Sequence, residues 1–387
     1  MLGKRRGFVV GTLFWVYVVH GLTLIMLGTV LPNLREAYAL DYGIGGMLLS
    51  IQSVGFLITG LFSGMLAVKF GLKRAYLLLF ALGILGLAML LADGAPLWLL
   101  AAMLLIGVTK GSVCDYNNRV VSSYSGGDSQ PLNLLHALYA VGACLAPLVV
   151  LLCLRADSVS GWRLALIIAI ALNLSAFIIG MFMKMDPVAV DSCEQAQSSF
   201  GFFRERLFWQ TTAIGFFYQA VEASIIGWLT SFYVGSGTMD ENSAQLVTAV
   251  LWVSLLVGRL TCTSVAARFH PWQMILVMCI GMAAFLALLL VGNSLPLMLA
   301  ATIGLGLCMS GMYGTSVANA GDMFTRYPIC MGIFVTLIGI GAVAAPTAVG
   351  LLADLVGIRL GMAVLLAGAA LLVVSAVINA QYFREKT

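Results

Sequence analysis

The chain has 387 residues, of which 61% are hydrophobic and only 9% charged, and its formal net charge at pH 7 is +4. Because soluble domains carry about 25% charged residues, this composition excludes an ordinary soluble domain. The basic residues are spread over short segments and do not indicate a nucleic-acid partner. Runs of roughly 20 apolar residues recur along the chain, each long enough to cross a hydrocarbon layer about 30 Å thick. Backbone polar groups there must be satisfied within the segment, so the runs predict an all-α, multi-pass membrane protein embedded in a lipid bilayer.

Hydropathy predicts twelve transmembrane helices, at 8–31, 44–68, 75–92, 97–121, 131–154, 162–183, 207–234, 243–266, 272–292, 295–318, 328–352 and 357–380. The first run follows basic residues but is longer than the apolar region of a secretory signal peptide, so we expect a retained span. The longest polar segment divides the helices into two sets of six. The expected organisation is therefore an N-terminal bundle at 1–183, a cytoplasmic linker at 184–206 and a C-terminal bundle at 207–387.

The distribution of Lys and Arg near the predicted helix ends indicates the orientation. If the N-terminus is cytoplasmic, most basic residues flank the cytoplasmic side, and the opposite side holds only Arg35, Arg155, Arg163 and Arg359. Cytoplasmic loops of membrane proteins carry an excess of basic residues. We therefore expect both termini and the middle linker to face the cytoplasm, in a bacterial cytoplasmic membrane.

The two halves repeat each other at an offset of 199 residues. At this offset three stretches match: LAVKF at 66–70 lies over VAARF at 265–269, GACLAP at 142–147 over GAVAAP at 341–346, and Gly107 over Gly306. One such match would be chance in so biased a composition, but three at one offset indicate a duplication. The repeat predicts two pseudo-symmetric six-helix bundles, an organisation that secondary transporters use.

One loop carries a family motif. The stretch GMLAVKFGLKR at 64–74 resembles the loop motif between the second and third helices of the major facilitator superfamily, G-x-L-A-D-R-x-G-R-K/R. The resemblance implies the major facilitator fold and a gating role for Lys69, Lys73 and Arg74. Val68 stands where the family usually has an Asp that helps to lock the cytoplasmic gate, so that detail does not carry over to this chain.

Other stretches resemble the fucose-permease-type sugar:proton symporters. They are GLTLIMLGTVLP at 21–32, Asp115 followed by Asn118, LHALYAVG at 135–142, and Glu222 to Trp228 with Tyr233. The resemblance implies a secondary transporter for a sugar or sugar-like solute, with protons as the coupling ion.

Acidic residues inside the predicted spans are few, and Glu222 lies near the middle of the seventh. A charge at the bilayer centre costs at least about 2.5–3.5 kcal/mol, so such a residue is expected to face an aqueous cavity or a partner. Glu222 is our candidate for proton coupling or substrate binding, and a neutral or paired carboxylate that joins two helices is the alternative. Asp115 is the reserve candidate for proton coupling, although Arg119, four residues later, is placed to neutralise it.

The fourth span is the most polar, with Lys110, Asn117 and Asn118 as candidate substrate ligands. Lys110 lies about ten residues from either end of its span, roughly 15 Å along the helix axis, too far for its ammonium to reach the membrane surface. It is therefore expected either to pair with Glu222 or to bind an anionic group of the substrate.

Further candidate ligands lie on three helices. They are His20 in the first, His136 in the fifth, and Gln219 and Trp228 in the seventh. Gln219 lies over His20 at the repeat offset, which favours a binding role for both. For each histidine a satisfied hydrogen bond between helices is the alternative. Arg259 in the eighth span is expected to anchor that helix near the cytoplasmic half.

These observations predict proton-coupled uptake of a small polar solute. Proton-driven efflux of a drug-like compound and uptake of an organic anion stay open, and a sensor on a transporter scaffold ranks behind them. No nucleophile motif, phosphate loop or metal-ligand cluster indicates an enzyme, and no cofactor or metal is expected. Only Cys193 lies in a predicted loop, and no CxxC pair indicates a disulfide framework or zinc site. We expect a monomer.

Overall fold

The computed structural model describes residues 2–125, 130–183, 200–266, 268–321 and 323–385. These residues are almost entirely α-helical, and no strand occurs among them. The all-α fold predicted from hydropathy is therefore confirmed. The chain divides into two compact units, Met1–Ser192 and Cys193–Thr387.

The described residues of the first unit form seven helices. They are α1 (Leu2–Thr29), α2 (Leu31–Ala37), α3 (Tyr42–Phe70), α4 (Leu72–Ala92), α5 (Pro96–Ser125), α6 (Gln130–Ala156) and α7 (Gly161–Phe182). Asp41 caps α3, since its Oδ1 accepts a hydrogen bond of 2.6 Å from the backbone N–H of Ile44. Gly71 joins α3 to α4 at φ +80°, a conformation that side chains with a Cβ rarely adopt. The family motif therefore sits on a tight turn between two long helices.

In the second unit the first described element is a short 3-10 helix. The elements of this unit are η1 (Phe200–Arg204), α8 (Arg206–Gly235), α9 (Glu241–Val265), α10 (Pro271–Val291), α11 (Leu295–Met309), α12 (Met312–Asn319), α13 (Met323–Arg326), α14 (Pro328–Val356) and α15 (Ile358–Arg384). Most of the predicted linker, 184–199, lies outside the described residues, as does Cys193. Phe202 of η1 is buried and packs edge-on against Phe208 of α8, which ties the end of the linker to this unit.

Eleven helices in the described residues are long and apolar enough to cross a membrane. The seventh predicted span, 207–234, is not among them, although α8 is one helix of 30 residues. Its polar residues, including Gln210, Gln219 and Glu222, lower its mean hydropathy. Because α8 packs against α9, α14 and α15, much of this polar surface lies inside the unit. A helix surrounded by other helices does not need a uniformly apolar surface.

The tenth predicted span, 295–318, is not one continuous helix. It is interrupted between Met309, where α11 ends, and Met312, where α12 begins. The predicted span is confirmed, because Leu295–Asn319 is one of the eleven stretches long and apolar enough to cross a membrane, and the interruption lies within it. The intervening Ser310 and Gly311 are small residues, and Gly311 in particular destabilises a helix interior.

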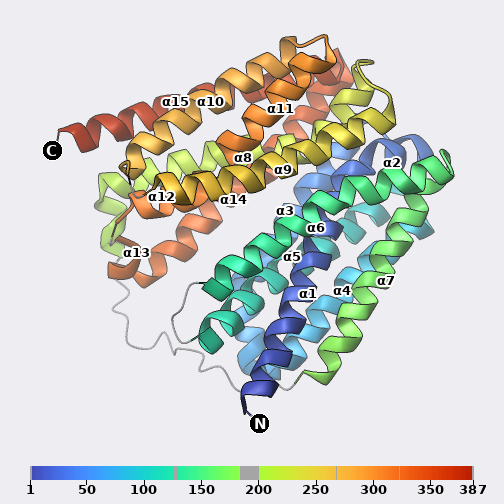
Figure 1. The fold of residues 1–387 in the computed structure, drawn as a ribbon, viewed down its shortest axis with the longest axis horizontal. Helices are drawn as coiled ribbons and strands as arrows, with labels where there is room; N and C mark the ends of the chain where they lie inside the picture. Colours follow the sequence, from blue (N-terminus) through green and yellow to red (C-terminus); the bar gives the residue numbers. More distant parts are fainter. Residues whose placement is uncertain (1, 126–129, 184–199, 267, 322, 386–387) are drawn as a thin grey trace. The chain divides into compact units, whose positions relative to one another are not determined.

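The repeat at the sequence level recurs in the packing of each unit. In the first, α1 packs against α6 and α3 against α5, and in the second the equivalent helices α8 and α14, and α9 and α11, pack together (Figure 1). A Cβ added to Gly107 would collide with the backbone carbonyl of Gln52, and one added to Gly306 would lie 2.7 Å from that of Leu251, the residue equivalent to Gln52. Small residues thus bring the same pair of backbones together in both units.

A second contact between the same helices differs in which helix carries the glycine. In the first unit Gly111 of α5 faces Thr59 of α3, whose Cβ lies 2.8 Å from the place that a Cβ on the glycine would take. In the second unit Gly258 of α9, equivalent to Thr59, faces Ser310, equivalent to Gly111, again with 2.8 Å to the serine Cβ. At each contact there is space for a side chain on only one of the two helices. In the first unit α3 carries that side chain, and in the second unit Ser310, at the end of α11, carries it.

Candidate functional site

Glu222 lies on α8 in the second unit and is half-buried. Its Oε1 accepts a hydrogen bond of 2.5 Å from the hydroxyl of Tyr218, one turn earlier on the same helix. The tyrosine side chain is buried. The Tyr218 hydroxyl thus donates to the carboxyl group from one turn away and fixes the position of the Glu222 side chain.

The Tyr218 hydroxyl also connects Glu222 to the interrupted helix. It lies 3.0 Å from the carbonyl oxygen of Met309, the last residue of α11. Carbonyls at a helix C-terminus lack a partner within the helix and accept hydrogen bonds from outside it. A hydroxyl has one hydrogen to donate, so the Glu222 carboxylate and the Met309 carbonyl share a single donor.

A cationic side chain lies near this hydrogen-bonded pair. Arg259 of α9 interacts electrostatically with Tyr218. We expected Arg259 to anchor α9 near the cytoplasmic half, and the structure brings it into range of the Tyr218–Glu222 pair. A carboxyl, a hydroxyl and a guanidinium from two helices thus gather inside one unit, a grouping suited to binding and releasing a proton.

The other two predicted ligands on α8 lie on either side of Glu222. Gln219 follows Tyr218 directly and is half-buried. Trp228 is completely buried, and its indole N–H donates a hydrogen bond of 3.1 Å to the carbonyl oxygen of Pro346 in α14. The contact of α8 with α14 therefore accounts for the polar group of Trp228. A stacking role for this residue on a solute stays a prediction.

In the first unit His20 belongs to an aromatic cluster of α1 and α6. The His20 ring centroid lies 6.1 Å from that of Tyr17 and 5.9 Å from that of Tyr139, and the His136 ring lies 5.7 Å from Tyr17. His136 is exposed, whereas His20 is only 4% exposed. The Nε2 atom of His20 has no hydrogen-bond partner among the described residues. A buried polar atom without a partner is uncommon, which marks this nitrogen as a candidate contact for a solute.

Lys110 of α5 lies beside this cluster. It interacts electrostatically with His20, and its Nζ lies 5.3 Å from the ring centroid of Phe56 in α3, a cation–π contact. Lys110 and Glu222 belong to different units, so a pairing between them stays a prediction.

The two asparagines of α5 both contact α1. The Asn117 side chain is buried and donates a hydrogen bond of 3.3 Å to the carbonyl oxygen of Leu13. Asn118 accepts one of 3.2 Å from the Tyr17 hydroxyl. Asn118 therefore joins the helix that carries Lys110 to the aromatic cluster, while Asn117 fixes the spacing of α5 and α1.

Asp115 is held by partners on two helices. Its Oδ2 accepts a hydrogen bond of 2.6 Å from the Ser63 hydroxyl of α3, and its Oδ1 forms an ion pair of 2.7 Å with Arg119. The neutralisation of Asp115 by Arg119, one of the two interpretations of this pair, is thus present in the structure. Both Asp115 oxygens thus have partners, and its coupling role stays a prediction.

The three candidate gating residues flank the turn at Gly71. Lys73 donates a hydrogen bond of 2.6 Å to the Met181 carbonyl oxygen near the end of α7, and Lys69 lies 5.4 Å from the ring centroid of Phe70. Arg74 is exposed. Lys73 therefore ties this turn to the end of α7 inside the first unit.

Three participants were missed at the level of sequence: Tyr218, the aromatic pair Tyr17 and Tyr139, and the Met309 carbonyl. The spacing of four residues between Tyr218 and Glu222 is a signal that could have found the first. The second could have been found from the helical spacing of Tyr17 and His20. A backbone carbonyl freed by a helix break leaves no signal in residue type.

Comparisons with known proteins agree with this architecture. The family model of the Major Facilitator Superfamily matches residues 13–295. The Major facilitator superfamily domain-containing protein 4A of Danio rerio is 25% identical over 137 residues, which are 35% of this chain and 26% of that protein. The chain thus matches about a quarter of the length of this curated relative.

Solved structures resemble the whole chain. A mutant of the nucleoside transporter NupG has a TM-score of 0.81 and 17% identity, covering 98% of this chain and 99% of that one. A bacterial homologue of the human lysosomal transporter Spinster has a TM-score of 0.78 and 13% identity, covering 98% of each chain. The fucose:proton symporter FucP of E. coli has a TM-score of 0.65 and 18% identity, covering 97% of this chain and 99% of that one. Identities this low show a shared fold.

Proposed function

Because the chain belongs to the Major Facilitator Superfamily of membrane transporters, we propose that it carries a small polar solute, a sugar or sugar-like compound, across the membrane together with a proton. Transport by alternating access requires a solute site where the two repeats meet. Coupling to protons also requires a group whose protonation differs between the two open states. The two polar clusters described above are our candidates for these functions, the α1–α5–α6 cluster for the solute and Glu222 for the proton.

The observation that carries the proposal is the hydrogen bond between Tyr218 and Glu222, in a helix that should not otherwise hold a carboxylate. When Glu222 is ionised, its carboxylate competes with the Met309 carbonyl for the single tyrosine hydrogen. When Glu222 is protonated, it no longer needs that donor, and Tyr218 is available to Met309 alone. Proton binding therefore selects between two hydrogen-bond arrangements, one of which strengthens the contact of α8 with the interrupted helix.

The solute class follows from the polar groups of the first unit. The unpartnered Nε2 of His20, the Lys110 ammonium and the Asn118 amide lie among aromatic rings. Sugars present hydroxyls to such polar groups and C–H faces to aromatic rings. Two of the structural neighbours are named as carriers of nucleosides and of fucose, both of which contain a sugar ring. The half-buried Lys110 ammonium also disfavours the cationic compounds that many efflux transporters export.

Uptake of an organic anion is a second candidate, favoured by the electrostatic contact of Lys110 with His20. A carboxylate placed between these two side chains would receive a charge-assisted hydrogen bond from the ammonium. A sugar acid would satisfy both candidates, because it combines hydroxyls with a carboxylate.

The orientation and the gate complete the proposal. We place both termini on the cytoplasmic side from the distribution of basic residues. Lys69, Lys73 and Arg74 then lie at a cytoplasmic gate. Support for the gate comes from the Lys73 hydrogen bond to the end of α7, which a rearrangement of the turn at Gly71 would break.

The experiment uses purified protein in proteoliposomes. A thermal-shift screen of sugars, nucleosides and sugar acids first identifies a solute, because a ligand stabilises the folded protein by RT ln(1 + [L]/Kd). Accumulation of that solute, radiolabelled, is then measured with and without an inward proton gradient. Glu222→Gln should abolish gradient-driven accumulation and retain solute exchange, whereas Glu36→Gln, an exposed control at the end of α2, should retain both.

Two results would contradict the assignment. Full gradient-driven accumulation by the Glu222→Gln variant would remove this residue from proton coupling and move the role to Asp115. Loss of both exchange and binding would make Glu222 a solute ligand or a structural residue. Shifts with sugar acids but not with neutral sugars would favour the organic-anion candidate.

A further inference from the structure

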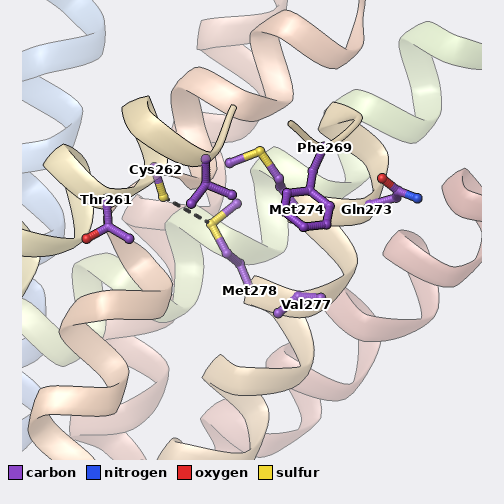
Figure 2. Close-up of a pocket in the computed structure, with 8 residues that line it drawn as sticks. Thr261, Cys262, Phe269, Gln273, Met274, Val277 and Met278 are labelled. Carbon is purple, nitrogen blue, oxygen red and sulfur yellow. Dashed lines mark hydrogen bonds between the residues drawn. The ribbon is translucent and has the colours of Figure 1, made fainter. Parts of the chain in front are cut away.

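An apolar groove lies on the second unit, between the end of α9 and the beginning of α10 (Figure 2). The cavity has a volume of about 260 Å³ and is lined mainly by Cys262, Val265, Phe269, Met274, Val277 and Met278. Phe269 and Val277 at its mouth are 53% and 70% exposed, so the groove opens to the surroundings of the protein. Exposed apolar patches of this kind are typical of surfaces that contact lipid or another protein.

The floor of the groove lies against the interrupted helix. The Cys262 and Met278 sulfur atoms face each other in the groove, 4.0 Å apart (Figure 2). Both lie close to Gly311, between α11 and α12. A Cβ on Gly311 would lie 2.5 Å from the cysteine sulfur and 3.4 Å from the methionine sulfur. The absence of a side chain at Gly311 therefore leaves room for the two sulfurs. Methionine adapts its shape to an occupant more easily than branched residues do.

Cationic and aromatic residues adjoin the lining residues of the groove in the sequence. Arg268 directly precedes Phe269 and is exposed. Trp272, which directly precedes the lining residue Gln273, has the Arg384 guanidinium 5.5 Å from its ring centroid and the His270 ring stacked at 6.5 Å. Aromatic and basic residues together are typical of the level of lipid headgroups. The segment from Arg268 to Gln273 also contains the N-terminus of α10, whose dipole favours negative charge.

We propose that the groove binds one acyl chain of an anionic phospholipid, with the phosphate of its headgroup beside Arg268 and Arg384. The apolar lining accommodates the chain, and the two arginines supply charge complementarity for the headgroup. Basic pockets between membrane helices on the cytoplasmic side are suited to anionic headgroups. This inference depends on the membrane placement of the second unit and not on the transported solute, so failure of the proton-coupling experiment would leave it intact.

The test uses the full chain in lipid nanodiscs and a photoactivatable diazirine on the acyl chain of phosphatidylglycerol or, in parallel, phosphatidylcholine. Mass spectrometry of the cross-linked peptides locates the label. We expect phosphatidylglycerol to label the peptides that contain Cys262 and Met278 roughly 25-fold more than phosphatidylcholine does, a factor of about five for each of the two arginines. The double substitution Arg268→Gln with Arg384→Gln should bring the ratio close to one. Arg204→Gln, an exposed control in η1, should not change it.

A second pair of variants tests the groove itself. Val277→Trp covers the mouth and should remove the label from both peptides with either lipid. Val291→Trp, on the same helix at a residue that is 67% exposed and does not line the groove, should leave the labelling unchanged. Equal labelling by the two lipids in the unsubstituted chain would overturn the headgroup assignment. Undiminished labelling in the folded Val277→Trp variant, with folding checked by gel filtration, would overturn the site.

Discussion

The close approach of α3 and α5 at Gly107 should make this glycine intolerant even of alanine. The carbonyl carbon of Gln52 would lie 2.8 Å and its Cα 3.0 Å from an added Cβ, with the carbonyl oxygen closer still. Ordinary C···O contacts between packed helices are about 3.3–3.6 Å. All of these atoms belong to the α3 backbone, so no side-chain rotation relieves the collision. The two helices would have to separate by on the order of 1 Å.

Gly60, also in the interior of α3, supplies the matched control, because a Cβ there would meet nothing within 4 Å. Alanine is a better helix former than glycine by about 0.8–1 kcal/mol, and this gain is common to both sites. Overpacking costs about 1–3 kcal/mol at Gly107 only. The difference between the two variants isolates the collision, so Gly107→Ala should be about 1–3 kcal/mol less stable than Gly60→Ala.

Thermal unfolding in detergent, followed by intrinsic fluorescence, measures this difference. At roughly 2–4 °C per kcal/mol, the Tm values of the two variants should differ by roughly 2–12 °C, with Gly107→Ala the lower. Gly306→Ala should destabilise the second unit in the same direction, since its Cβ would lie 2.6 Å from the Ser254 Cβ. A Gly107→Ala variant as stable as Gly60→Ala would refute the packing argument.

Three further predictions concern the site, a helix cap and the orientation. In a double-mutant cycle measured by thermal unfolding, Tyr218→Phe and Glu222→Gln should show a coupling energy of about 1–3 kcal/mol. Strictly additive effects of the two substitutions would mean that their hydrogen bond contributes nothing to the stability of the fold. Asp41→Ala should destabilise the protein by about 1 kcal/mol, because the Ile44 N–H loses its cap. Asp41→Asn should retain most of the stability, and the difference between the thermal unfolding midpoints of the two variants tests this. Cys193 should react with a membrane-impermeant maleimide only in opened cells, and labelling of intact cells would reverse the predicted orientation.

The helices and the repeat were accessible from the sequence because both depend on local patterns. An apolar run in a membrane forms its own hydrogen bonds, so its length and hydropathy are sufficient to locate it. The match of Gly107 with Gly306 carried over into equivalent backbone contacts because glycines in membrane helices mark close approaches. Glu222 stood out in the sequence because a carboxyl in an apolar span is costly.

The parts that the sequence did not predict depend on contacts between distant segments. The indole of Trp228 finds its acceptor on Pro346, 118 residues away, and no local pattern shows this. The interruption of the tenth span was missed because a small residue such as Gly311 within an apolar run is common in continuous membrane helices. The donor shared by Glu222 and Met309 depends on how α8 lies against α11, which is a property of the packed unit.

At the second contact of α3 with α5 the glycine lies on α5, whereas at the equivalent contact of the second unit it lies on α9. This difference determines which helices could be exchanged between the two repeats. Placing the α5 sequence in the position of α11 would set Gly111 against Gly258 and leave a void, which membrane helices can close by sliding together. The reverse transfer would set Ser310 against Thr59, with two side chains in a space that admits one. At this contact the two helices are therefore exchangeable between the repeats in one direction only.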